Sequence, residues 1–290
     1  MKRGKNLDDE WSYHALPCDE PAVHRVRVFD IDGDGKPEIV HVPLMGRGSS
    51  AKGLWVDGKP VRIVALKVPA KEPEKKENWK AEVISEELNV CHNFCLDTFP
   101  KPDVRTPPVL LVTSYEGVHR LPQGPLGVVR TSERIGEGNQ VNPKGNRGAS
   151  EIKCGLLSNA PVIATIEPWH GDHVVVYIEP KAKGNGKTLW DRHVLDEQLK
   201  WGHAVACANL DDDPEQELII GVRDDLESNH RCGVRIYDPK TRSPTTGTTT
   251  TMTWERQLVR PGQFTVEDLA VGDFDQDGDI DIVAVGRATH

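Results

Sequence analysis

Short segments in which apolar and polar residues alternate recur along the chain, and turns rich in Gly, Pro and Asp separate them. In the clearest copy, an alternating segment at 203–208 leads through a turn into an almost wholly apolar one at 217–222, and a third segment follows at 233–238. No stretch shows the apolar spacing of a helix face. Short strands at regular spacing, bounded by these turn residues, predict an all-β fold.

Copies of this pattern cover nearly the whole chain and begin near residues 24, 92, 150, 203 and 267. In several copies a fourth segment follows, and these segments open at Trp11, Trp79, Trp190 and Trp254. Four strands per repeat with a period of about 50–70 residues predict the blades of a β-propeller. We therefore predict one β-propeller domain over residues 1–290, with five recognisable units and with the four Trp residues packed between blades.

The last copy stops after two strands, at "DIVAVGRATH". The segment from Trp11 reads as a fourth strand without the three that should precede it, so it could complete the last copy and close a five-bladed ring. The pattern also fits a piece of a larger, seven-bladed propeller, whose incomplete blade leaves an open sheet edge. The sequence leaves these two alternatives open.

Three of the five copies carry an acidic loop after their first strand, with oxygen-bearing side chains at a first position and two, four and eight residues later. Carboxylates this close repel one another, and Ca²⁺ prefers six or more oxygen ligands. We predict a structural Ca²⁺ in each loop, weakest where an Asn replaces an Asp. The predicted ligands are Asp30, Asp32, Asp34 and Glu38; Asn209, Asp211, Asp213 and Glu217; and Asp273, Asp275, Asp277 and Asp281.

Composition narrows the range of partners. The 290 residues are 37% hydrophobic, enough for a sizeable core. A formal net charge of -9 argues against nucleic acid and anionic membrane surfaces. No apolar run approaches about 18 residues, so no membrane span is expected, and the N-terminus lacks the apolar core of a signal peptide. The six cysteines form no zinc-site spacing, and we expect most of them to be buried free thiols.

The segments "DIDGDGKPEIV" and "DFDQDGDIDIV" resemble the FG-GAP/VCBS repeats of calcium-binding propellers, seen also in integrin α heads. The segments "WGHAVACANLDDD", "GVRDDL" and "VEDLAVGDFDQDGDIDIVAVGRATH" resemble, more closely, the propeller of aldos-2-ulose dehydratases and their bacterial relatives. That resemblance implies a carbon–oxygen lyase that dehydrates an anhydro-ketosugar at a metal-assisted site. It also suggests an extracellular or periplasmic place, although the chain carries no signal peptide. The copies near 92 and 150 lack the acidic motif, so no cation is predicted there.

Each copy begins with a polar residue at one register, six positions before the acidic loop where a loop is present. The first strands of propeller blades line the central channel, so these residues are expected to meet at one mouth. Imidazoles and a carboxylate gathered there could bind a divalent metal such as Zn²⁺ or perform acid–base chemistry. The alternative is that a hydrated channel mouth simply collects polar residues. The five positions are His24, His92, Ser150, His203 and Glu267.

Loops after second strands supply further polar groups on what we predict to be the same face. They offer His170, Asp172 and His173; Tyr115, Glu116 and His119; Arg223, Asp224 and Asp225; and Arg287 and His290. A sugar site needs such a mixture of aromatic and charged groups. Together with the channel-mouth residues, His170, His173 and Arg287 are our candidates for catalysis.

Two functions remain. The first is a carbohydrate lyase in which a channel-mouth His abstracts a proton next to a carbonyl, while a metal or Arg holds the developing enolate. The second is a non-catalytic adhesion or interaction propeller that binds glycan or protein through its loop face. The recurring His register and the closer family resemblance favour the lyase. The incomplete last copy favours the second function or an inactive fragment.

Overall fold

The computed structural model describes residues 4–6, 8–97, 109–122, 124–141, 145–180, 189–211, 213–223, 232–242 and 251–286. The chain forms two compact units. Unit 1 comprises Met1–Cys91, Lys101–Val109 and Leu121–Ser132, and unit 2 comprises His92–Pro100, Leu110–Arg120 and Glu133–His290. Among the described residues, no helix has both the length and the apolarity that crossing a membrane would require.

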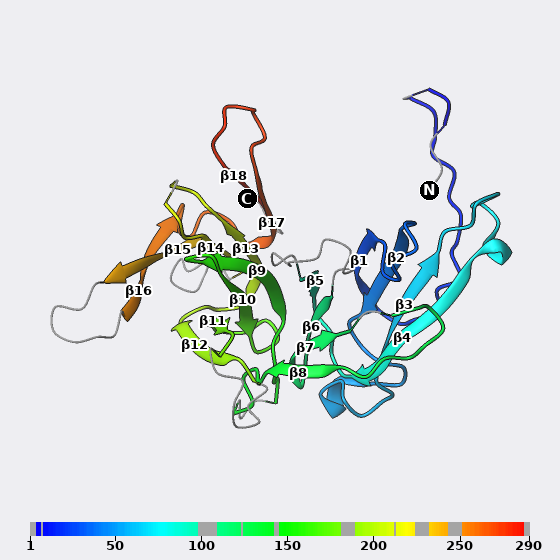
Figure 1. Ribbon diagram of the computed structural model, residues 1–290, viewed down its shortest axis with the longest axis horizontal. Helices are drawn as coiled ribbons and strands as arrows, with labels where there is room; N and C mark the ends of the chain where they lie inside the picture. The colour runs from blue at the N-terminus through cyan, green and yellow to red at the C-terminus, as the bar shows by residue number, and fades with distance from the viewer. Residues whose placement is uncertain are drawn as a thin grey trace. The chain divides into compact units, whose positions relative to one another are not determined.

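Unit 1 is built on one antiparallel sheet in the order β1-β2-β3-β4 (Figure 1). Its strands are β1 (Val23–Phe29), β2 (Glu38–Pro43), β3 (Val61–Lys67) and β4 (Lys80–Leu88), and two 3-10 turns, η1 (Ala51–Gly53) and η2 (Lys76–Asn78), lie between them. β2 and β3 are buried along most of their length, because both flank the middle of the sheet and carry β-branched residues.

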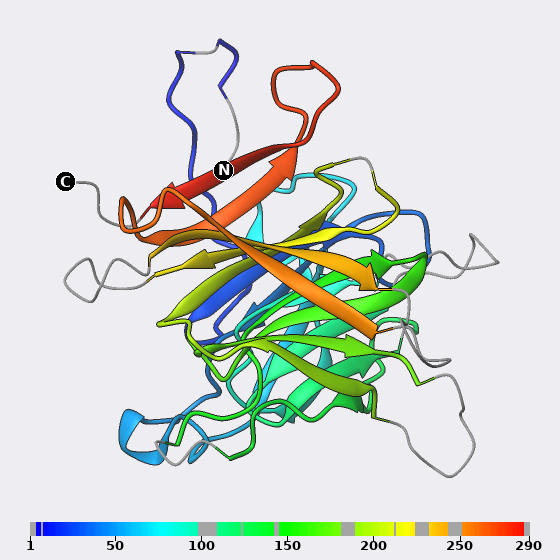
Figure 2. The ribbon, with the colours of Figure 1, turned by 90° about the vertical axis from the view of Figure 1, so that its left-hand side faces the viewer.

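Unit 2 holds three four-stranded antiparallel sheets and one two-stranded sheet (Figures 1 and 2). The first is β5 (Phe94–Leu96), β6 (Leu110–Ser114), β7 (Gly117–Leu121) and β8 (Glu133–Gly136). The second is β9 (Glu151–Leu157), β10 (Ala160–Glu167), β11 (His173–Ile178) and β12 (Asp191–Asp196). The third is β13 (Gly202–Ala208), β14 (Glu217–Val222), β15 (Gly233–Arg242) and β16 (Thr251–Val259), and the last pair is β17 (Val266–Gly272) and β18 (Asp281–Gly286). The all-β prediction is confirmed.

The first strands of successive sheets in unit 2 lie next to one another: β5 contacts β9, β9 contacts β13, and β13 contacts β17. Small residues allow this approach. A Cβ added to Gly155 on β9 would lie 3.0 Å from the Cys207 side chain on β13. Apolar side chains between the sheets form the core; Val162 and Ile166 of β10, for example, pack with Val205 and Leu218 of the next sheet. First strands in contact, each followed by a meander, are the arrangement of propeller blades.

The segment from Trp11 does not form the expected strand. Residues 11–17 are irregular, Trp11 is 54% exposed, and β17–β18 is a two-stranded sheet. With an exposed Trp the segment buries too little apolar surface to hold a strand in place. The other three Trp-led segments do form the fourth strands β4, β12 and β16. Whether the whole chain forms a single ring stays a prediction.

The Trp residues differ in their packing. Trp190 is 5% exposed and lies in the core cluster with Tyr177, and Trp254 packs partly against the next cluster. Trp79 donates its indole N–H to the carbonyl of Pro73 at 2.8 Å. Packing between sheets therefore describes Trp190 and Trp254, but not Trp11.

A buried carboxylate joins three strands of one sheet in unit 2. Glu167, fully buried at the end of β10, accepts hydrogen bonds from the Tyr177 hydroxyl (2.5 Å) and from two nitrogens of Arg192 (2.9 and 2.7 Å). Burial raises the pKa of Glu167, and Arg192 opposes that rise. The same hydroxyl accepts a hydrogen bond of 2.9 Å from the backbone amide of Gly138, which lies just after β8. Tyr177 is therefore a polar link between neighbouring sheets.

Replacing Tyr177 by Phe should lower the free energy of unfolding by about 1–3 kcal/mol. The change leaves the buried Gly138 amide without its partner and removes one of two hydrogen bonds to Glu167 Oε1, the other coming from the Thr165 hydroxyl. Urea unfolding followed by circular dichroism measures this change. Tyr13→Phe is the control, since Tyr13 is 79% exposed. Equal urea midpoints for Tyr177→Phe and wild type would show that this link contributes nothing.

Candidate functional site

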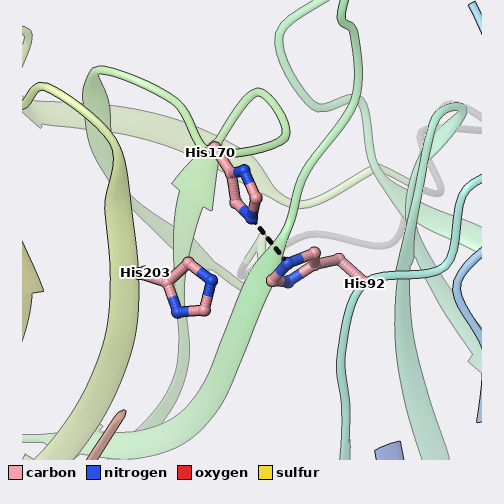
Figure 3. Close-up of side chains that lie close together, drawn as sticks. All are labelled: His92, His170 and His203. Carbon is pink, nitrogen blue, oxygen red and sulfur yellow. Dashed lines mark hydrogen bonds between the residues drawn. The ribbon is translucent and has the colours of Figure 1, made fainter. Parts of the chain in front are cut away.

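Three imidazoles meet in unit 2 (Figure 3). His92 lies just before β5, His170 in the turn between β10 and β11, and His203 on β13. Their ring centroids are 4.9 Å apart for His92 and His170, 5.4 Å for His92 and His203, and 4.8 Å for His170 and His203. One nitrogen of each ring lies within 4.8 Å of the others, so the three residues can hold one metal ion.

Neighbouring oxygens fix two of the rings. The carbonyl of Glu267 can only accept a hydrogen bond, so His203 Nδ1, at 2.6 Å, carries the proton. The carboxylate of Glu151 lies 2.7 Å from His92 Nδ1 and favours a proton there as well. The Nε2 atoms are thus left without protons in the neutral rings and turn toward the shared centre, as Figure 3 shows. In metal sites, a carboxylate or carbonyl oxygen commonly accepts a hydrogen bond from the imidazole nitrogen that faces away from the metal.

His170 completes the cluster from a left-handed backbone conformation, with φ of 48°. Its Nε2 lies 3.0 Å from His92 Nε2. Burial lowers the pKa of His170 to about 2, and His92, His203 and Arg223 add to that effect. A ring that stays neutral across the physiological range is ready to bind a metal without first losing a proton.

Glu267 lies beside His203 and Arg223. Its Oε2 is 3.6 Å from His203 Nε2, and its Oε1 is 3.1 Å from Arg223 Nε. The structure thus brings together three of the five residues expected at one register: His92, His203 and Glu267.

The other two residues of that register are placed differently. Ser150 is fully buried, and its hydroxyl donates to the Ile166 carbonyl at 3.1 Å, which gives it a structural role. His24 lies on β1 in unit 1, and its relation to the cluster stays a prediction.

A cavity of about 660 Å³ opens beside the cluster and is bounded by His170 together with its neighbours. Trp169 and Trp201 contribute aromatic surface, and Trp201 is 49% exposed. His173 also lines the cavity, and its Nδ1 lies 2.5 Å from Asp172 Oδ1. Trp169 Nε1 is buried and has no hydrogen-bond partner among the described residues. Aromatic faces with a few polar groups suit a sugar ring.

Other predicted loop residues lie elsewhere. His119 is buried on β7, and Glu116 belongs to the turn between β6 and β7. Asp224, Asp225, Arg287 and His290 lie outside the described residues.

The first and third acidic loops share one hydrogen-bond pattern, and in all three loops the amide at plus six donates to the carboxylate at plus four. In the first, Asp30 accepts from the amides of Asp34 (3.2 Å) and Gly35 (2.8 Å), and Asp34 accepts from Lys36 (2.9 Å). The third loop repeats these bonds, with Asp273 accepting from the amides of Asp277 and Gly278, both at 3.1 Å. These bonds curl each loop so that alternate carboxylates turn toward one centre. The clusters are Asp30, Asp32 and Glu38; Asp211, Asp213 and Asp238; and Asp273, Asp275 and Asp281.

The acid at the eighth position closes each loop by accepting an amide hydrogen, as Glu38 does from Ile31 (3.2 Å) and Glu217 from Leu210 (2.6 Å). The other oxygens of Glu38 and Glu217 are buried and have no hydrogen-bond partner among the described residues. Burial raises the pKa of both carboxyls. An oxygen left bare in this way fits a cation ligand, so the first two loops have a donor set suited to Ca²⁺.

Lysines lie against two of the loops. Lys67 on β3 is 2.7 Å from Asp34 Oδ2, while Lys240 on β15 is 2.5 Å from Asp238 and 3.9 Å from Asp211. An ammonium group can neutralise part of the charge that a cation would otherwise balance. Within the described residues, the third loop has no such lysine.

Sequence reasoning missed three contributors. Glu151 follows the predicted Ser150, and only the contact between β5 and β9 shows that it, rather than Ser150, reaches His92. Asp238 joins the second acidic loop from a third strand, which the spacing within the loop could not reveal. Trp201 directly precedes β13. The sequence pointed to it only as the first residue of the segment "WGHAVACANLDDD", which resembles dehydratase propellers.

Four-stranded antiparallel sheets with their first strands side by side, and a polar cluster where those strands begin, place the chain in the class of β-propeller proteins. A family model described as "Aldos-2-ulose dehydratase, beta-propeller domain" matches residues 2–180, and the chain belongs to that family. The resemblance to dehydratase propellers is therefore confirmed. The resemblance to FG-GAP/VCBS repeats stays a prediction.

The chain is also similar to an aldos-2-ulose dehydratase of Phanerodontia chrysosporium, with 23% identity over 250 residues. The match covers 80% of this chain and 26% of that relative. The chain thus spans about a quarter of the relative's length.

The metal-free protein should lose stability on acidification partly through His170. Its pKa is about 2 in the folded chain, against an ordinary value of 6.5. Between these values the unfolded chain binds more protons, so the free energy of unfolding falls as the pH falls below 6.5. At pH 5 this one residue should lower the free energy of unfolding by about 2 kcal/mol.

Urea unfolding with a chelator at pH 7 and pH 5 measures the effect. His170→Gln cannot titrate and should lose about 2 kcal/mol less than wild type between the two pH values. His193→Gln, a change at an exposed position on β12, should behave like wild type. The same loss in His170→Gln and wild type would contradict the expectation.

Proposed function

We propose that His92, His170 and His203 bind a divalent transition metal such as Zn²⁺, and that the chain dehydrates a keto-sugar in the adjoining cavity. The observation that carries this proposal is the arrangement of the three rings, two of them held from behind so that their Nε2 atoms face one centre. Three imidazole ligands with room for a fourth are the pattern of catalytic rather than structural zinc. Membership in the dehydratase propeller family supports the reaction class.

The cavity offers places for a sugar. Trp201 presents an exposed face on which a pyranose ring can stack. Trp169 has a buried N–H without a partner among the described residues, and a sugar hydroxyl or carbonyl oxygen would satisfy it. When bound, a metal ion at the three imidazoles would polarise the substrate carbonyl.

His173 is our choice for the base, in place of a histidine of the cluster. The cluster rings turn toward one another, whereas His173 lines the cavity and is held through Nδ1 by Asp172. Its Nε2 takes the proton from the carbon next to the carbonyl, and the electron pair moves toward that carbonyl. The hydroxyl on the following carbon then leaves as water, taking up the proton from the His173 imidazolium. Asp172 stabilises the imidazolium between the two transfers.

Activity is tested by incubating the zinc-loaded chain with an aldos-2-ulose or an anhydro-ketosugar and following the ultraviolet absorption of the conjugated ketone product. His173→Gln should lower kcat by about 10²–10⁴-fold and leave zinc binding unchanged. His203→Ala should abolish zinc binding, measured by calorimetry, together with activity. His193→Gln is the control for both measurements.

Two results would count against this proposal. Absence of zinc binding by the wild type would remove the metal centre. Zinc binding and sugar binding without any elimination would favour the alternative, a module that binds glycan without catalysis.

We also propose that the acidic loops bind Ca²⁺ as structural ions. The shared curl of the loops, and the bare buried oxygens of Glu38 and Glu217, support this. Lys67 and Lys240 would then have to move away from the carboxylates that they contact.

Calcium should raise the melting temperature, because an ion that binds only the folded chain stabilises it by about 2.7 kcal/mol per site at a hundredfold excess over Kd. Thermal melts across a Ca²⁺ series with and without chelator measure this. Asp275→Asn together with Asp277→Asn should remove the part contributed by the third loop. A melting temperature that does not move with Ca²⁺ would leave the lysines as the counter-ions of the first two loops.

A further inference from the structure

Three cysteines of unit 2 lie on consecutive first strands: Cys95 on β5, Cys154 on β9 and Cys207 on β13. They are free thiols, and each is partly exposed. None of them takes part in the histidine cluster, the cavity or the acidic loops.

Two of these thiols are in contact. Cys95 Sγ lies 3.6 Å from Cys154 Sγ. Cys154 Sγ also lies 3.5 Å from the Leu96 carbonyl, to which its S–H donates. The proton shared between the sulfurs therefore comes from Cys95. A disulfide needs the two sulfurs at about 2.05 Å, so they must approach by roughly 1.5 Å, which rotation of the side chains can supply.

The strands hold this pair in register. His92 Nδ1 lies 2.7 Å from Glu151 Oε1. Cys95 comes three residues after His92, and Cys154 comes three residues after Glu151. Both contacts join residues 59 positions apart. Two contacts with the same sequence separation mean that β5 and β9 run in the same direction at a fixed register. The backbone therefore places the two thiols next to each other.

We propose that Cys95 and Cys154 form a reversible disulfide that joins the sheets of β5 and β9, with a low-molecular-weight disulfide such as oxidised glutathione as the oxidant. One cysteine thiolate attacks a glutathione sulfur and releases one glutathione thiolate. The second cysteine thiolate then attacks the protein sulfur of the mixed disulfide and releases the other glutathione. Two protein thiols are oxidised, one glutathione disulfide is reduced to two thiols, and the two protons pass to the released thiolates.

The setting of the thiols makes this exchange slow at neutral pH. The contact with Cys154 and burial raise the pKa of Cys95, and burial raises that of Cys207 to about 12, whereas Lys153 acts in the opposite direction on both. The attacking species is the thiolate, so the rate of exchange should still be rising with pH above the ordinary thiol range.

The test is to reduce the full chain, remove the reductant, add oxidised glutathione at pH 8 and count thiols after denaturation. Of the six cysteines, four should remain as thiols, and digestion should give a peptide carrying Cys95 linked to one carrying Cys154. The oxidised chain should melt about 5 °C or more above the reduced chain, and dithiothreitol should reverse this.

Cys91→Ser is the matched control, because Cys91 lies four residues from Cys95, is buried, and should leave the link intact. Cys95→Ser should retain all of its thiols apart from slow background oxidation. The link is measured in the wild type, so a variant that fails to fold does not affect the result. Six remaining thiols, a stable mixed disulfide with glutathione, or a link to Cys207 or between chains would each overturn the proposal.

Discussion

The close packing of first strands within unit 2 is the constraint on which its other features depend. β5, β9 and β13 lie side by side, and a residue such as Gly155 leaves no room for a larger side chain against Cys207. Once that register is fixed, residues far apart in the chain are brought together at set levels. His92 meets Glu151 at one level and Cys95 meets Cys154 three residues further on. The histidine cluster and the thiol pair are thus two results of one packing arrangement.

The polar groups buried at these levels are stabilised by pairing with one another. Glu151 is 3% exposed and lies against His92, and Glu167 is fully buried but bound by Tyr177 and Arg192. A buried carboxylate without such partners would cost several kcal/mol. The cluster gains orientation from the same pairing, since an imidazole held at Nδ1 can turn only Nε2 toward the centre.

The repeat made much of the fold predictable. Alternating strands, a period and a recurring Trp were enough to expect four-stranded sheets and to place β4, β12 and β16. They failed at Trp11, because a pattern cannot tell whether a segment finds a surface to cover. For the site, a shared register pointed to His92 and His203. The contact of His170 with both depends on a turn with positive φ, which spacing along a strand does not encode.

The ends of a first strand have different physical demands. β13 carries His203 at its start, and the acidic loop with Asn209 follows its end. Six residues at about 3.3 Å separate these positions by about 20 Å. A cation at the loop would interact only weakly with the imidazoles, because that distance exceeds the Debye length of about 8 Å in physiological salt. In the proposed assignment, the loops would therefore use hard oxygen ligands to hold a hairpin, while the other end would keep nitrogen ligands beside the cavity. Each end would then select its own kind of metal by its donor atoms.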